Sequence, residues 1–109
     1  MKLWIDDLRP APATDYIWVK SVNEAKRVII DAENMSNKPR LFDCDFRFTL
    51  LDIDHDAGQF ASNGGDYIKL LDWLEETGRN YPIRIHSMNS VGVANMRAII
   101  QHNGWTEVR

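Results

Sequence analysis

Leu3-Trp4-Ile5-Asp6-Asp7 is a short apolar run that stops at two adjacent acids. An apolar run of this length is typical of an interior strand in a parallel sheet, because both faces of such a strand are covered. Asp6 and Asp7 would then follow the carboxyl end of that strand. The segment therefore predicts a buried strand that carries two acids to one edge of a sheet.

Strands and helices are expected to alternate through the rest of the chain. A loop with two prolines over 8–15 leads into a predicted strand at 16–19. Ser21 and Glu24 have the spacing of a capping box, so we expect a helix from about 22 to about 34 and a polar break at 36–39. The remaining predicted elements are a strand over 46–53, a glycine-containing loop over 57–65, a helix over 67–78, a strand over 82–87, a helix beginning near a Ser90 cap and closed by Asn103-Gly104, and a short strand over 105–108.

This order, β-β-α-β-α-β-α-β, predicts right-handed crossovers and a mostly parallel sheet. The 109 residues suit one α/β domain over 1–109, and 44% hydrophobic with 27% charged residues is ordinary for a globular protein. The formal charge of −3 argues against a broad nucleic-acid surface. The single cysteine, Cys44, excludes an internal disulfide, and we expect neither a signal peptide nor a membrane span. A cytoplasmic protein is therefore expected.

Three of the predicted strands end in reactive side chains: Asp6-Asp7, Asp54-His55-Asp56 and His86-Ser87. In an open parallel sheet, ligands bind beyond the carboxyl ends of the strands. Clustered carboxylates repel one another unless a cation compensates. Oxygen ligands favour Mg²⁺, Mn²⁺ or Ca²⁺, the histidines leave Zn²⁺ open, and Arg9 or Arg84 could supply positive charge instead.

Each of these residues also has an ordinary structural explanation. An Asp after a strand is often a turn former or a helix cap, and a lone His at a strand end is more often structural. Ser87 and Asn89 are good helix caps. The prediction of a joint site depends on three strand ends agreeing. The remaining candidates have structural interpretations only: Asp43 and Asp45 as solvated loop acids, and Trp4, Trp18, Trp73 and Trp105 as core or rim residues.

Three motifs, in the same order, resemble those of one known family. Residues 3–10, Leu-Trp-Ile-Asp-Asp-Leu-Arg-Pro, are similar to its opening LWLDDxRP signature. Residues 54–58 resemble its DHDLG segment, with Ala57 in place of Leu. Residues 83–92 resemble its IRIHSxNPVG segment, with Ser90 in place of Pro. The sequence resembles, from end to end, the cyclic-phosphate processing receiver domain family.

The resemblance implies a single three-layer, flavodoxin-like and receiver-like domain. Its mostly parallel sheet would have five strands in the order 2-1-3-4-5, with three helices. The resemblance also implies an active site built from the acid pair, the Asp-His pair and the later His. Within a receiver, Asp54 matches the phosphoacceptor and Ser87 the Ser/Thr position.

Two departures put ordinary phosphorelay in doubt. A proline loop replaces the helix between the first two strands, and the lysine expected at the end of the fifth strand is not present in 105–109. The resemblance implies, as the first hypothesis, a phosphoesterase that acts on a cyclic phosphate. Its ligand would be a small phosphorylated molecule, either a cyclic nucleotide or an RNA 2′,3′-cyclic end. The alternative is a non-catalytic, receiver-like binding or regulatory module, and a nucleic-acid-associated protein without chemistry is the weakest hypothesis.

The phosphoesterase hypothesis gives each candidate residue a role. His55 and His86 would be general base and acid, in either order, and Asp54 would either hold a metal or attack directly. The predicted set is catalytic His55, His86 and Asp54; ligand-binding Arg9, Ser87 and Asn89; and metal-binding Asp6, Asp7, Asp54 and Asp56, with Mg²⁺ or Mn²⁺ as the expected divalent metal.

Overall fold

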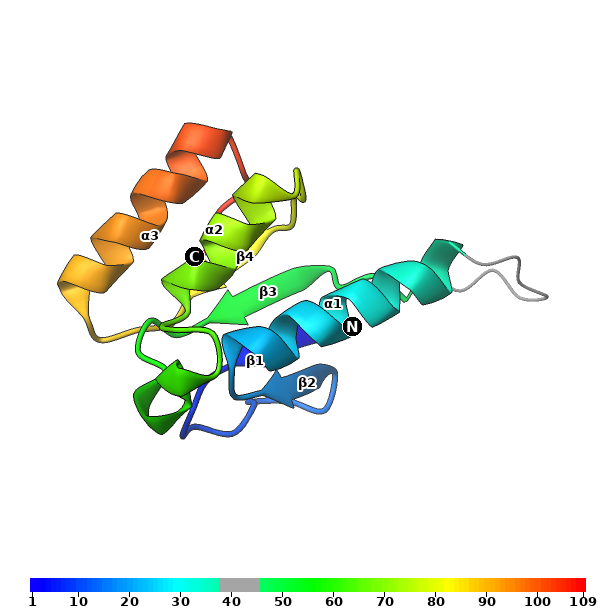
Figure 1. Ribbon diagram of the computed structural model, residues 1–109, viewed down its shortest axis with the longest axis horizontal. Helices are drawn as coiled ribbons and strands as arrows, with labels where there is room; N and C mark the ends of the chain where they lie inside the picture. Colours follow the sequence, from blue (N-terminus) through cyan, green and yellow to red (C-terminus); the bar gives the residue numbers. More distant parts are fainter. Residues whose placement is uncertain (38–45) are drawn as a thin grey trace.

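The computed structural model describes residues 1–37 and 46–109, and Figure 1 shows the arrangement of the elements. The elements are β1 (Lys2–Ile5), β2 (Tyr16–Val19), α1 (Val22–Asn37), β3 (Leu50–Ile53), a 3₁₀ helix η1 (Gly58–Ser62), α2 (Ile68–Glu76), β4 (Ile83–Ile85) and α3 (Ser90–Asn103). Within these residues, no helix combines the length and the apolar character that crossing a membrane requires.

The four strands form one parallel sheet in the order β2-β1-β3-β4. The register places residues of β1, β3 and β4 in rows across the sheet. Trp4, Asp52 and Arg84 form one row. Ile5, Ile53 and Ile85 form the next row, at the carboxyl edge. The strand order matches the first four positions of the predicted order.

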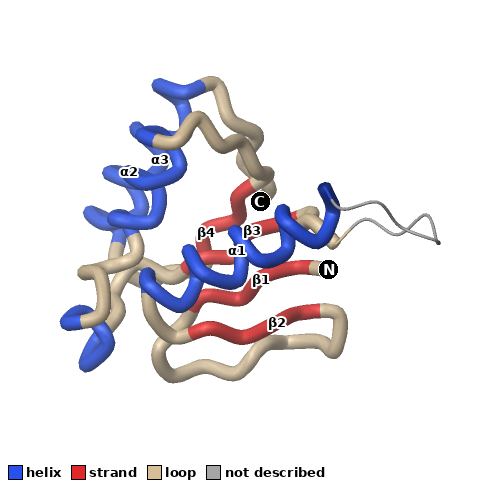
Figure 2. Tube along the Cα trace, turned by 45° about the vertical axis from the view of Figure 1, so that its right-hand side comes forward, coloured by secondary structure: helices blue, strands red, loops and turns tan. Residues whose placement is uncertain are grey.

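All three helices lie on one face of the sheet. Leu3, Ile5, Leu51, Ile53 and Ile83 join residues of α1, α2 and α3 in a single buried cluster. Successive side chains of a strand point to opposite faces, so the residues between them point away from the helices. In Figure 2, α1 runs along the strands and overlies the middle of the sheet. The fold therefore has two layers, with an apolar face under the helices and a second face that carries polar and aromatic side chains.

The prediction of a third layer is wrong. The connection from β1 to β2 crosses the sheet in the opposite direction to the connections that follow it. A right-handed crossover there would place a helix on the second face. Instead, residues 6–15 form a proline-containing loop. The indole nitrogens of two tryptophans hold this loop, with Trp4 donating to Arg9 O at 2.8 Å and Trp18 donating to Asp6 O at 2.7 Å.

The predicted fifth strand at 105–108 is also wrong, since that segment forms only an isolated parallel bridge between Glu107 and Ile83. The predicted strand at 46–53 begins only at Leu50. Its register pairs Leu50 with Lys2, so residues before it have almost no neighbouring strand to join. The described residues form four strands, and the sheet ends at β4 except for this bridge.

Two predicted helix boundaries also shift. α1 continues through Ser36 and Asn37, where a break was predicted, because such residues lower helix stability by only a fraction of a kcal/mol, on the order of 0.5. α3 is capped by Asn89 rather than by Ser90, with the Asn89 side chain accepting a hydrogen bond from Gly92 N at 2.9 Å. The predictions for Asp43, Cys44 and Asp45 fall outside the described residues.

Candidate functional site

The carboxyl edge of the sheet brings together residues far apart in the sequence. Beyond the row of Ile5, Ile53 and Ile85, the next residues are Asp6, Asp54 and His86. The backbone amides continue the ladder by one residue, with Asp54 N donating to Ile5 O and His86 N donating to Ile53 O, both at 2.9 Å. The side chains of this outer row therefore point to the same face as Trp4, Asp52 and Arg84.

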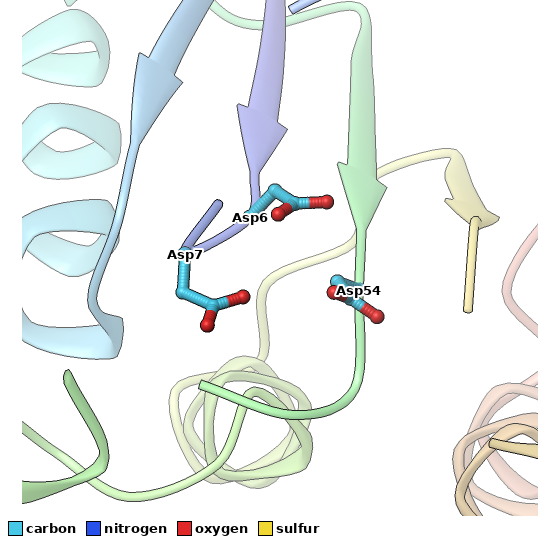
Figure 3. A group of neighbouring side chains, drawn as sticks. All are labelled: Asp6, Asp7 and Asp54. Atoms are coloured by element: carbon cyan, nitrogen blue, oxygen red, sulfur yellow. The ribbon is translucent and has the colours of Figure 1, made fainter. Parts of the chain in front are cut away.

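Three carboxylates form an acidic group at this edge, shown in Figure 3. Asp6 and Asp7 follow β1, Asp54 follows β3, and one oxygen of each lies within 4.8 Å of the others. Carboxylate oxygens are the ligands that Mg²⁺, Mn²⁺ and Ca²⁺ prefer. The donor set therefore fits a hard divalent cation, and it comes from two neighbouring strand ends of a rigid sheet.

Asp6 is buried, and both of its carboxylate oxygens have partners. Oδ1 accepts hydrogen bonds from Leu8 N at 2.9 Å and Arg9 N at 2.8 Å. Oδ2 lies 3.0 Å from Nε2 of His86 and 3.4 Å from Nε of Arg9. Burial acts to raise the pKa of Asp6, but the two amides and His86 outweigh it and lower the pKa below the ordinary value. Asp6 is therefore ionised at neutral pH.

Asp54 lies in a less favourable electrostatic position. Burial, and the negative charge of Asp6, raise its pKa above the ordinary value, against hydrogen bonds from His55 N and the Ser87 hydroxyl. His55 N donates to Asp54 Oδ1 at 2.8 Å. The nearest guanidinium nitrogen of Arg9 is 3.9 Å from Oδ2, on a side chain that is 56% exposed. A cation bound between Asp6 and Asp54 would relieve their repulsion.

Asp7 depends on a glycine in the loop after β3. Gly58 has φ +55, and a Cβ added there would collide with Oδ2 of Asp7. Only glycine adopts this backbone conformation without strain and leaves the space that the carboxylate occupies. Gly58, the glycine of the DHDxG segment, therefore leaves the space that the Asp7 carboxylate needs to lie in the acidic group.

His86 lies between two carboxylates and against an indole ring. Nδ1 is 2.6 Å from Asp52 Oδ1, and Nε2 is 3.0 Å from Asp6 Oδ2. The imidazole stacks on Trp4 with ring centroids 3.7 Å apart and planes 4° from parallel. Each ring nitrogen therefore faces a carboxyl group whose pKa is lowered below its ordinary value, and the ring is held from both ends.

Asp52 was not among the predicted site residues, and the structure buries it completely. Besides His86 on Oδ1, its Oδ2 accepts from Tyr16 OH at 3.1 Å and from Arg84 Nη1 at 3.2 Å. Burial acts to raise the pKa of Asp52, but His86 and Arg84 lower it overall. The signal in the sequence was an acid within an apolar strand, two residues before Asp54 and so on the same face.

His55, Asp56 and Asn89 form a second polar group. His55 Nδ1 is 2.7 Å from Asp56 Oδ1, and Asn89 Nδ2 donates to the same oxygen at 3.3 Å. The hydrogen bond from His55 lowers the pKa of Asp56. Asp56 is 61% exposed and is not a member of the Asp6, Asp7 and Asp54 group. The predicted metal-binding acids therefore fall into two groups. Asp6, Asp7 and Asp54 lie together at the carboxyl edge of the sheet, and Asp56 contacts the imidazole of His55.

Ser87 and Asn89 connect the two polar groups. The Ser87 hydroxyl accepts from Asn89 N at 3.1 Å and hydrogen-bonds to Asp54. Asn89 caps α3 through its oxygen while its Nδ2 contacts Asp56. Both residues thus act as caps or turn formers and also contact the predicted site, so the two interpretations are compatible.

A parallel sheet in the order 2-1-3-4, with paired acids after β1 and a third acid after β3, defines a receiver-like α/β domain. The family model for the cyclic-phosphate processing receiver domain matches residues 1–102, and the chain belongs to this family. No curated protein and no solved structure gave a match.

Proposed function

We propose that the domain is a metal-dependent phosphoesterase that opens a cyclic phosphate at the carboxyl edge of its sheet. The observation that carries the proposal is the group of three carboxylates, whose ligand atoms lie within 4.8 Å of one another. Asp6, Asp7 and Asp54 would hold Mg²⁺ or Mn²⁺, and membership of the cyclic-phosphate processing family suggests the substrate class. A bound metal would supply positive charge to the phosphate oxygens as negative charge develops on them.

Arg9 would bind the substrate phosphate. Its guanidinium contacts Asp6 and Asp54 only at 3.4 and 3.9 Å, and its side chain is largely exposed. Contacts of this length on an exposed side chain are weak, so a metal at the carboxylates would free Arg9 for a second anion. Ser87 and Asn89 would add hydrogen bonds to the same ligand.

His55 fits the role of general base. Among the described residues, the short contact of its ring is made by Nδ1, which lies 2.7 Å from Asp56 Oδ1. A carboxylate that accepts the Nδ1 proton leaves the lone pair on Nε2. Asp56 would therefore orient His55 rather than bind the metal.

The proposed step is an attack by water on phosphorus. Nε2 of His55 takes a proton from water as the water oxygen forms its bond to phosphorus. The ester P–O bond of the ring breaks, and in the proposal the leaving oxygen takes a proton from Nε2 of His86, which lies 3.0 Å from Asp6 Oδ2. The product is an open phosphate monoester. The ligand would be a cyclic nucleotide or an RNA 2′,3′-cyclic end.

The test is ³¹P NMR of the purified protein with cyclic phosphates, including 2′,3′-cyclic nucleotides, in the presence of Mg²⁺, Mn²⁺ or a chelator. We expect ring opening that the chelator abolishes and that His55→Ala reduces by about 10²-fold or more. His102→Ala is the matched control, because His102 is exposed on α3 away from the site. Turnover that survives both His55→Ala and His86→Ala would contradict the mechanism.

A specific observation favours the second candidate, a non-catalytic receiver-like module. Both ring nitrogens of His86 already face carboxylates, so the ring is held rather than free. If no metal supports turnover while Asp54 accepts a phosphoryl group from a small phosphodonor, the domain is such a module. Asp54→Asn would abolish that labelling.

A further inference from the structure

Asp52 is a charged side chain buried in the middle of a strand. It has no exposed surface, and it lies two residues before the carboxylate of Asp54. An ionised group in such a position is strongly unfavourable unless it is fully paired. Its two oxygens have different partners. Oδ1 contacts His86, and Oδ2 accepts hydrogen bonds from Tyr16 and Arg84.

We propose that Asp52 is a positioning residue that fixes the ring of His86 so that Nε2 faces Asp6. This inference rests on the proposed function only in taking Asp6 as a metal ligand. The imidazole is held at Nδ1 by Asp52 at 2.6 Å, on one face by Trp4, and at Nε2 by Asp6 at 3.0 Å. A ring flipped by half a turn would present carbon atoms to both carboxylates, so the contact with Asp52 selects one orientation.

The orientation of His86 in turn restrains Asp6. Oδ2 of Asp6 faces His86, while Oδ1 is held by two backbone amides of the following loop. A partner behind a first ligand commonly orients it, and losing such a partner reduces metal affinity about 10- to 100-fold. Asp52 therefore acts on the acidic group through one intervening ring.

The contacts of Asp52 can be separated experimentally because each oxygen has different partners. Tyr16→Phe and Arg84→Gln each remove a contact to Oδ2 and leave the contact between Oδ1 and His86 in place. If Asp52 were only a structural anchor for Tyr16 and Arg84, these variants would have the same effect as changing Asp52 itself. If Asp52 positions His86, they would not.

The first measurement is NMR of the ring N–H protons of ¹⁵N-histidine-labelled protein without metal. We expect a His86 Nδ1–H resonance far downfield, as a short hydrogen bond to a carboxylate produces. It should move upfield in Asp52→Asn, disappear in Asp52→Leu, and stay in Tyr16→Phe and Arg84→Gln. A resonance that does not change in Asp52→Asn would overturn the proposal, even if Asp52→Leu fails to fold.

The second measurement is Mn²⁺ affinity by calorimetry. We expect a loss of about 10-fold or more in Asp52→Leu, recovery of most of it in Asp52→Asn, whose oxygen still accepts from Nδ1, and little change in Tyr16→Phe. Equal losses in Tyr16→Phe and Asp52→Leu would contradict positioning. A wild-type domain that binds no metal would contradict the proposed function, while the NMR comparison would still decide the role of Asp52.

Discussion

At the scale of single residues, Gly92 contributes to the site by lacking a side chain. It is buried in the first turn of α3, and a Cβ added there would collide with the ring of His55. Gly is about 1 kcal/mol less favourable than Ala in a helix interior, so helix propensity alone would favour Ala. The space taken by His55 therefore decides this position.

We predict that Gly92→Ala destabilises the fold by about 1–3 kcal/mol, because the methyl group displaces His55 or the start of α3. In a His55→Ala background, the same change should be neutral or stabilising. Denaturant unfolding of the four proteins of this double-mutant cycle measures the coupling. Strictly additive effects would show that the two residues do not compete for space.

At the scale of elements, α1 is tied to the segment between α2 and β4 by one carboxylate. Arg79 donates to Glu33 from Nη2 at 2.9 Å and from Nε at 3.1 Å, and Tyr81 OH donates to the same carboxylate. Burial acts to raise the pKa of Glu33, but these partners lower it overall. The same contact, with burial as the larger cause, raises the pKa of Tyr81 to about 12.

We predict that Glu33→Gln lowers the free energy of unfolding by about 1–3 kcal/mol at pH 7. Because the folded-state pKa of Glu33 is below the unfolded value near 4.5, its contribution is present above that value and is lost as pH falls through the folded pKa. The difference between wild type and variant should thus shrink below about pH 5. Glu76→Gln, at an exposed position of α2, is the control. A gap that stays constant from pH 7 to pH 3 would refute this assignment.

The sequence was informative about elements because each kind of element has its own period. Alternating strands and helices predicted the parallel sheet, and the acids at strand ends predicted that Asp6, Asp54 and His86 meet. The sequence was less informative about the number of layers. That number depends on the direction in which each connection crosses the sheet and on the loop over residues 6–15. Asp52 was missed because the role of an acid within a strand depends on its neighbours in the adjacent strands. Those neighbours, Trp4 and Arg84, lie next to Asp52 in the strand register but far from it in the sequence.

At the scale of the whole molecule, the acidic group lies at the carboxyl edge of the sheet and outside the apolar core. The apolar cluster lies beneath the helices and includes none of the three carboxylates. Burial, and after it the negative charge of Asp6, raise the pKa of Asp54, so its ionised form is disfavoured in the fold. Binding of a divalent cation should therefore stabilise the entire domain.

We predict that Mg²⁺ or Mn²⁺ at 100 times its Kd raises the free energy of unfolding by about 2.7 kcal/mol. Asp54→Asn should abolish this gain. Without metal, Asp54→Asn should be at least as stable as wild type at pH 7, because it removes a charge that the fold disfavours. Thermal unfolding with and without metal, at matched ionic strength, measures both effects. A metal-dependent rise of equal size in Asp54→Asn would place the cation elsewhere.

The outermost row of the sheet also fixes the backbone positions of the side chains at its carboxyl edge. Asp6, Asp54 and His86 follow three adjacent parallel strands, and neighbouring strands lie about 4.8 Å apart in any sheet. Their backbone positions can change only if the strands themselves separate, while the side chains can cross that spacing, since His86 Nε2 lies 3.0 Å from Asp6 Oδ2. Adjustment to ligands of different size would then fall to the side chains and the loops, while the strand ends stay in place.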